Sequence, residues 1–159
     1  MKKIASFTVN HINLFPGVYV SRRDKTRSGD VVTTFDLRFK APNREPVMDM
    51  PALHTIEHLG ATFLRNYAEW SERIIYFGPM GCRTGFYVIL DGELESSEIL
   101  GLVKEMLQFI GAFEGEIPGA KPAECGNYSE QNLNMAKYEA EKYLQALEQA
   151  GGANLVYPE

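Results

Sequence analysis

The sequence predicts an α+β fold in which a largely antiparallel sheet packs against helices, and three observations support this. Runs of strand-forming residues come early, and hairpin-length links join them. Helical stretches with apolar positions on one face are interspersed with these strands. The 159 residues contain no repeat, no low-complexity segment and no domain linker. We therefore expect residues 1–159 to form a single domain with one core.

The strands are expected at Ser6–Val9, Gly17–Val20, Val31–Lys40, Arg73–Phe77 and Phe86–Leu90. The third of them alternates between apolar and polar residues, which is typical of a strand with one buried and one exposed face. Arg38 lies on its polar face, where it is either solvated or holds a carboxylate in a bidentate contact. The charged stretch 21–30 is expected to be a loop.

Three helices are expected. The central one covers residues 51–70, with Asp49 as its cap and Pro51 in the first turn, where a missing N–H costs nothing. A second, from Glu98 to Phe113, follows the capping residues 95–97 and carries an apolar stripe. The last begins at Ser129 and ends near Gln149, before two glycines.

Composition excludes several classes of protein. The formal net charge of −5 argues against a role in binding nucleic acid or bulk membrane surface. No apolar run approaches a membrane span, and the N-terminus is too short and too polar for a signal sequence. Two cysteines, Cys82 and Cys125, indicate a protein of the reducing cytoplasm without a disulfide framework.

The sequence His-Thr-Ile-Glu-His at residues 54–58 carries the strongest chemical signal. A helix turns by about 100° per residue, so His54 and His58 lie roughly 40° apart, one turn above the other. Both imidazoles can then reach one metal ion, and Glu57 is close enough to handle protons without being a ligand. Two unrelated core histidines are the structural alternative. Metalloproteases of the inverted zinc type also carry this motif, so it leaves the reaction open.

The two cysteines extend this hypothesis. Cys125 lies beside a glycine in the loop 114–127 and is a reasonable third ligand, because a thiolate complements imidazole on zinc or ferrous iron. Three protein ligands leave a position open, which marks a catalytic metal. Cys82 lies among three glycines and a proline, which indicates a tight turn that presents the thiol. A metal with two proton carriers, Glu57 and Cys82, suits enolisation and elimination beside a carbonyl. His11 reads as an ordinary polar loop residue.

Several segments, in this order, together resemble the S-ribosylhomocysteine lyase family, which makes the autoinducer-2 precursor in bacteria. They are Ser6–His11, Phe35–Phe39 with Pro42-Asn43, His54–Leu59 with Arg65-Asn66, Pro79–Tyr87, and Cys125-Gly126. The resemblance extends from near residue 4 to about residue 145. Its combination of H-x-x-E-H with P-M-G-C-x-T-G-F-Y is highly specific.

The resemblance implies a homodimer with two active sites at the subunit interface, each holding one Fe²⁺ that Zn²⁺ or Co²⁺ can replace. It assigns His54, His58 and Cys125 as metal ligands. Glu57 and Cys82 become the general acid/base pair that moves the sugar carbonyl through enediolates and promotes β-elimination. The products are homocysteine and 4,5-dihydroxy-2,3-pentanedione. The resemblance places Ser6, His11 and Arg38 in the substrate pocket.

Two positions depart from the family pattern. Tyr76 stands where the family usually has an aspartate near the substrate, and Gly78 stands where a serine is common. A phenol donates a hydrogen bond but is neutral at pH 7, so substrate affinity is expected to differ. Two alternatives remain: a zinc peptidase that uses H-x-x-E-H with Cys82 irrelevant, and a non-catalytic metal-binding module in which Cys82→Ala is silent.

Overall fold

The computed structural model describes residues 4–159 and contains a four-stranded antiparallel sheet of strand order β1-β2-β4-β3. The strands are β1 (Gly17–Lys25), β2 (Val31–Arg38), β3 (Ile74–Pro79) and β4 (Gly85–Asp91). The α-helices are α1 (Met50–Asn66), α2 (Ser96–Ala112) and α3 (Leu133–Ala150), with short 3₁₀ turns at Ala5–Phe7 and Ser71–Arg73. The predicted α+β class is confirmed.

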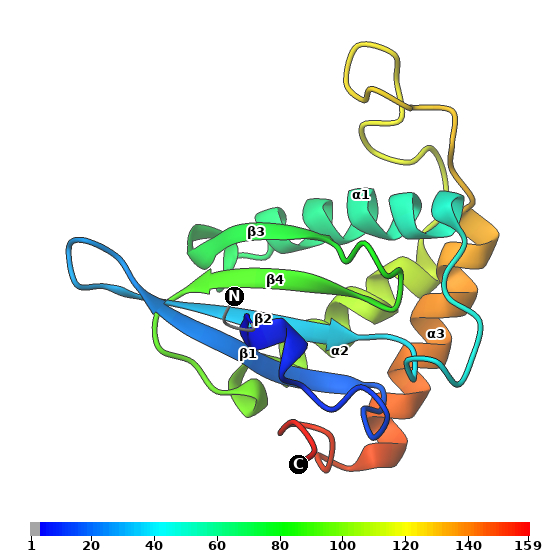
Figure 1. The fold of residues 1–159 in the computed structure, drawn as a ribbon. Coiled ribbons are helices and arrows are strands. Elements are labelled where there is room, and N and C mark those ends of the chain that lie inside the picture. The colour runs from blue at the N-terminus through cyan, green and yellow to red at the C-terminus, as the bar shows by residue number, and fades with distance from the viewer. Residues whose placement is uncertain (1–3) are drawn as a thin grey trace.

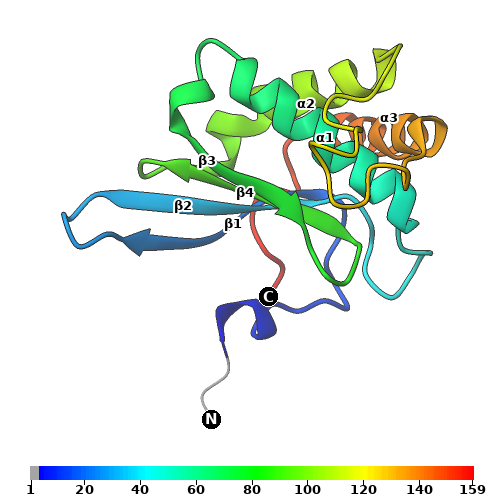
Figure 2. The same ribbon diagram turned by 90° about the horizontal axis from the view of Figure 1, so that it is seen from above.

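The two faces of the sheet have different neighbours. The three α-helices cover one face, whereas the N-terminal segment and the C-terminal tail lie on the other (Figures 1 and 2). The main core fills the space between sheet and helices, where apolar residues of β2 and β4 meet those of α1, α2 and α3. Within the described residues, no helix is both long and apolar enough to cross a membrane.

Strand register sets which residues share the outer face, the one away from the helices. Asp36 of β2 pairs with Tyr19 of β1 on one side and with Tyr87 of β4 on the other. Tyr87 in turn pairs with Gly78 of β3. Directly paired residues of antiparallel strands project to the same face, so these four form one row across the sheet. Arg38 lies two residues after Asp36 on the same face.

The prediction that this strand has one exposed face is wrong, because most residues of β2 are buried on both faces of the sheet. Asp36 and Arg38 are only 1% and 3% exposed, although both lie on the outer face. The C-terminal tail is one cause: the Tyr157 ring stacks on Tyr19, with centroids 4.9 Å apart, and its hydroxyl donates to Asp36 Oδ2 at 2.9 Å. Lys40, just after β2, is buried in an ion pair with Glu139 of α3.

Several other predicted elements differ from those in the structure, either in type or in where they begin. The segment 6–9 is not a strand, because the chain there makes a 3₁₀ turn and bends. Residues 21–25 are not loop but continue β1, since residues 22–25 pair with β2 beyond a bulge between Val20 and Arg22. Helix α2 begins at Ser96 with a capping box formed by Glu95 and Glu98. Helix α3 begins later than expected, capped by Asn132 in place of Ser129.

Candidate metal centre

Helix α1 holds the two histidines on the side that faces away from its buried residues. Its core side carries Ile56, Leu59 and Leu64, all of which are buried. Across its other side passes the long loop between α2 and α3, which projects from the body of the protein (Figure 1). This loop brings Cys125 to α1 from a distant part of the sequence.

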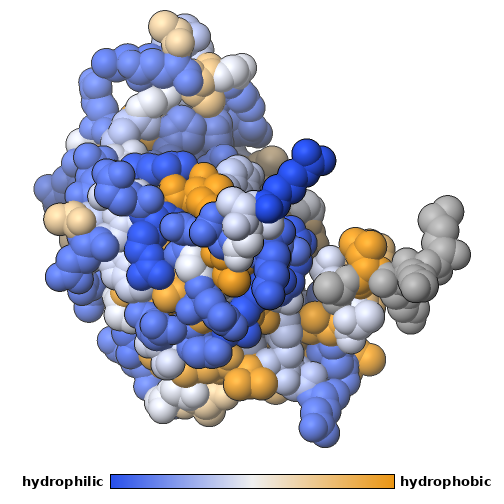
Figure 3. All heavy atoms as spheres, turned by 90° about the vertical axis from the view of Figure 1, so that its left-hand side faces the viewer, coloured by the Kyte–Doolittle hydropathy of each residue, from blue (hydrophilic) through white to orange (hydrophobic). Residues whose placement is uncertain are grey.

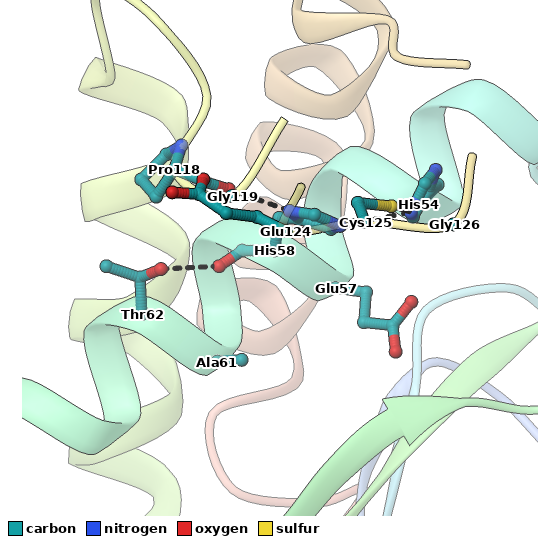
Figure 4. A pocket seen from close by; sticks show the side chains of 10 residues that line it. All are labelled: His54, Glu57, His58, Ala61, Thr62, Pro118, Gly119, Glu124, Cys125 and Gly126. Atoms are coloured by element: carbon teal, nitrogen blue, oxygen red, sulfur yellow. Dashed lines mark hydrogen bonds between the residues drawn. The ribbon is translucent and has the colours of Figure 1, made fainter. Parts of the chain in front are cut away.

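The three predicted ligands meet at one point (Figure 4). His54 Nε2 lies 3.0 Å from His58 Nε2 and 3.4 Å from Cys125 Sγ. One ligand atom from each residue lies within 4.8 Å of the other two. The backbone N–H of Asn127 donates to Cys125 Sγ at 3.4 Å.

The outer nitrogens of both rings are held by backbone carbonyls of the same loop. His54 Nδ1 lies 2.9 Å from the oxygen of Glu130, and His58 Nδ1 lies 2.7 Å from the oxygen of Pro118. A carbonyl oxygen only accepts, so each Nδ1 carries the hydrogen. Gln131 Nε2 is the more distant neighbour of His54 Nδ1, at 3.3 Å. In both rings Nε2 is therefore the nitrogen available to a metal, and it lies on the side of the other ring and the sulfur.

This arrangement fits a divalent cation. Two nitrogen lone pairs and a sulfur that face one another repel unless a positive charge lies between them. Ring nitrogens fixed by carbonyls on the far side are the usual support for histidines that bind a metal. Two imidazoles and a thiolate form a ligand set for Zn²⁺ or Fe²⁺, with a fourth position left for water or substrate.

The loop can approach His58 this closely because residue 119 is a glycine. Its φ of +73° lies in the left-handed region, and a Cβ there would lie 3.1 Å from His58 Nδ1. Gly119 therefore allows the neighbouring carbonyl of Pro118 to reach the ring.

Glu57 shares a cavity of about 530 Å³ with the three ligands. Its carboxylate extends from α1 toward the strands and does not point into the ligand cluster (Figure 4). Glu57 therefore lies beside the three predicted ligands and is not a fourth ligand in this arrangement, and its role as a proton carrier stays a prediction.

The other predicted site residues meet in a second hollow. Ser6, His11, Arg38 and Cys82 line a cavity of about 350 Å³ on the outer face, with Tyr87 of β4 among its walls. The residues that line this hollow and those that line the metal cavity are different sets. Within one chain, the metal ligands and Glu57 therefore form one half-site, and Cys82 with the predicted substrate-binding residues forms another.

Cys82 lies in the turn between β3 and β4 and is exposed. The turn is tight, since Arg83 has a φ of 60°. Cys82 Sγ lies 3.1 Å from the Thr84 hydroxyl and 4.0 Å from Arg38 Nη1. Partial burial raises the pKa of the Cys82 thiol, but hydrogen bonds with Thr84 and the charge of Arg38 outweigh it, so that this pKa lies below its ordinary value.

Sequence reasoning missed two residues of this half-site, Asp36 and Thr84. Arg38 donates to Asp36 Oδ2 at 2.5 Å and to Thr84 Oγ1 at 2.6 Å, and all three side chains are buried. An acid and a base two residues apart on one strand face are a signal that could have revealed the ion pair. Thr84 gave no such signal.

The two departures from the family pattern are explained by one contact. The Tyr76 side chain folds over Gly78, so closely that a Cβ on Gly78 would lie 2.0 Å from the Tyr76 hydroxyl oxygen. A serine at position 78 would collide with this phenol. Tyr76 therefore requires Gly78 in the observed arrangement.

Three residues that could hold a metal ion, with a carboxylate beside them in an open cavity, are typical of a catalytic metalloenzyme. The S-ribosylhomocysteinase (LuxS) family model matches residues 4–152, and the chain belongs to this family. It is similar to proteins named S-ribosylhomocysteine lyase: 57% identical to one from Finegoldia magna over 159 residues and 58% identical to one from Clostridium acetobutylicum over 160, with all of each chain covered. It is 56% identical to one from Borreliella burgdorferi over 158 residues, which cover 99% of this chain and 100% of that one. The predicted family is confirmed, and nothing found supports the zinc peptidase.

Proposed function

We propose that this chain is a metal-dependent carbon–sulfur lyase that converts S-ribosylhomocysteine to homocysteine and 4,5-dihydroxy-2,3-pentanedione. Membership of the S-ribosylhomocysteinase family and full-length relatives named for this reaction support the substrate. The observation that carries the chemistry is the His54–His58–Cys125 cluster beside Glu57 in one open cavity. We treat residues 1–159 as one catalytic domain.

The metal is proposed to be one Fe²⁺ per chain, with Zn²⁺ or Co²⁺ able to replace it. Two imidazoles and a thiolate suit all three ions, and the metal available to the protein decides among them. When bound, such an ion acts as a Lewis acid on a carbonyl or hydroxyl oxygen and makes the adjacent C–H more acidic. His54, His58 and Cys125 hold it, and the loop carbonyls orient the two rings.

Glu57 and Cys82 are proposed to move the protons. Carbonyl migration along a sugar requires a proton to leave one carbon and another to reach its neighbour, and two carriers on different sides of the substrate divide this work. Cys82 suits the role of a base, because Thr84 and Arg38 lower the pKa of its thiol. Loss of a proton next to the carbonyl then allows the bond from carbon to the homocysteine sulfur to break.

Ser6, His11 and Arg38 are proposed to bind the substrate. They line the hollow that contains Cys82 and offer it a hydroxyl, a ring nitrogen and a guanidinium group. His11 is held by its own segment, since its Nδ1 lies 2.9 Å from the oxygen of Val9. The other ring nitrogen is then free to contact a sugar hydroxyl.

We propose that the protein is a homodimer whose active sites combine the two half-sites of different chains. Glu57 and Cys82 line separate cavities within one chain, although one substrate needs both. The N-terminal segment beside the Cys82 hollow exposes Phe7 and Ile12, at 72% and 73%. Figure 3 shows exposed hydrophobic residues, in orange, on the face of the molecule that it draws. A partner could cover these side chains and bring its metal half-site to Cys82.

We also propose that the protein is cytoplasmic. Cys82 and Cys125 are both free cysteines, which are typical of proteins in a reducing compartment.

Release of free thiol from S-ribosylhomocysteine under anaerobic conditions tests the reaction. We expect Glu57→Gln and Cys82→Ala to keep fold and metal but to lose homocysteine release. Near-wild-type turnover in either variant would contradict its assigned role. An unreactive wild-type protein with metal bound would contradict the function itself.

Mixing the two inactive variants tests the shared active site. If Glu57 and Cys82 of one site come from different chains, a Glu57→Gln/Cys82→Ala heterodimer has one doubly altered site and one intact site, and activity returns. If they come from the same chain, both sites carry one defect and activity stays lost. Size-exclusion chromatography with light scattering measures the dimer independently.

A further inference from the structure

The turn that carries Cys82 is fixed to the neighbouring strand through residue 84. The backbone N–H groups of Phe39 and Lys40 both donate to the backbone carbonyl oxygen of Thr84 at 3.0 Å. Within the turn, the backbone N–H of Met80 donates to the carbonyl oxygen of Gly85 at 2.9 Å. The Thr84 side chain is buried at 5% exposure, between Arg38 and Cys82. Its hydroxyl therefore has a defined position relative to the thiol.

Among the residues that the structure describes, Cys82 Sγ is an acceptor within reach of the hydrogen of this hydroxyl. A guanidinium group only donates, so Thr84 Oγ1 accepts from Arg38 Nη1 at 2.6 Å. The hydroxyl's own hydrogen is then free to point at Cys82 Sγ, 3.1 Å away. A thiolate accepts this hydrogen, whereas a neutral thiol would have to find a different arrangement for its S–H.

Thr84 is also the closer of the two polar neighbours of the sulfur. Arg38 Nη1 is 4.0 Å from Cys82 Sγ, and the opposite side of the guanidinium is engaged by Asp36. The Asp36 carboxylate thus offsets part of the electrostatic effect that the Arg38 charge has on the thiol. The Thr84 hydroxyl, which accepts from Arg38 and is polarised by it, lies 3.1 Å from the sulfur.

We propose that Thr84 is a positioning residue that holds Cys82 as a thiolate and directs its sulfur into the hollow. The inference deepens the proposed function, because it explains how Cys82 serves as a base. Its chemical claim concerns the free protein and does not need the lyase reaction.

The other titratable groups around the hollow are Arg38 on β2, Tyr87 on β4 and His11 on the N-terminal segment, with Asp36 behind Arg38. Burial raises the pKa of Tyr87, so this phenol stays neutral near pH 7. None of these four residues is substituted in a Thr84 variant, and the one contact that Thr84→Val takes from them is the hydrogen bond from Arg38 Nη1 to the Thr84 hydroxyl. A difference between variant and wild type therefore reports on the hydroxyl.

The test is the pH dependence of Cys82 alkylation by iodoacetamide in the full-length, metal-loaded protein, because only the thiolate reacts. Mass spectrometry of the Cys82 peptide separates this thiol from Cys125. Thr84→Val removes the hydroxyl at nearly constant shape, Thr84→Ser retains it, and Thr26→Val in the exposed β1–β2 hairpin is the matched control.

We expect the midpoint of the alkylation profile to rise by about one pH unit in Thr84→Val, which slows alkylation about tenfold below the midpoint. Thr84→Ser should restore the wild-type profile, and Thr26→Val should not change it. An unshifted profile in folded Thr84→Val overturns the inference. If Thr84→Val does not fold, the alkylation profile of the wild-type protein provides the test. A midpoint for Cys82 at or above that of a free cysteine overturns the inference.

The lyase assay separates this inference from the proposed function. A shifted profile in a protein without lyase activity refutes the function and supports the role of Thr84. An active protein whose profile does not depend on Thr84 refutes the inference alone.

Discussion

The Asp36–Arg38 ion pair beneath the Cys82 hollow gives a prediction whose size follows from burial. Asp36→Asn removes one charge of a pair that is 1% and 3% exposed, with 2.5 Å between Arg38 Nη2 and Asp36 Oδ2. The shape of the side chain is kept, but the guanidinium stays buried without a counter-charge. Breaking such a pair costs about 3–5 kcal/mol in the free energy of unfolding.

For a protein of this size, each kcal/mol lowers the melting temperature by about 2–4 °C, so we expect a fall of roughly 6–20 °C. Thermal and urea unfolding of the metal-loaded protein measure the change. Asp24→Asn is the matched control, because Asp24 also pairs with an arginine, at 2.6 Å, but both side chains are more than half exposed. Its effect should be about 1 kcal/mol or less.

A second variant tests the reasoning itself. Asp36→Asn combined with Arg38→Met removes both charges, so no guanidinium is left without a partner. The double variant should be more stable than Asp36→Asn alone, even though it carries one more substitution. If Asp36→Asn is as stable as Asp24→Asn, the pair does not stabilise the fold, and the argument from burial is refuted.

Three further predictions concern the metal centre and the pH dependence of stability. His58→Ala should lose most bound metal, since two protein ligands rarely hold a labile divalent ion; unchanged stoichiometry by elemental analysis would contradict this. Gly119→Ala should weaken metal binding by about 10–100-fold in a chelator competition, because its Cβ would press on His58 and disturb the supporting carbonyl. The pKa of Glu45 is lowered: partial burial raises it, but hydrogen bonds from Lys142 and the Ala41 N–H, with the charge of Lys40, outweigh burial. Glu45 therefore stabilises the fold above the ordinary carboxyl range, and this is lost as the pH falls through its lowered pKa. Glu45→Gln should flatten the decline of melting temperature with acid, and an unchanged curve would contradict the assignment.

The fold class and the metal half-site were predictable because their signals are local. The spacing of His54 and His58 is a property of one helix, and apolar periodicity identified the core side of that helix. Cys125 required only the chemistry of its neighbours and the family pattern. Family and lyase function are confirmed by the comparisons, whereas the individual roles of the site residues stay predictions.

The features of the fold and the site that the sequence did not predict depend on contacts between distant segments. Alternation in β2 predicted an exposed face, and no local pattern indicates that a tail more than 100 residues away covers it. Residues 22–25 are charged and exposed, so their pairing with β2 left no apolar signal. Thr84 acts through the direction of one hydroxyl hydrogen, which only the surrounding donors define.

The contact between Tyr157 and Asp36 has a consequence for the exposure of the sheet. Tyr157 lies 121 residues after Asp36, and the tail that carries it adds no strand to the sheet. Detachment of this tail would leave all four strands paired. It would nevertheless remove the Tyr157 ring from Tyr19 and let water reach the carboxylate of Asp36, so solvent access to this buried charge depends on the tail and not on the sheet itself.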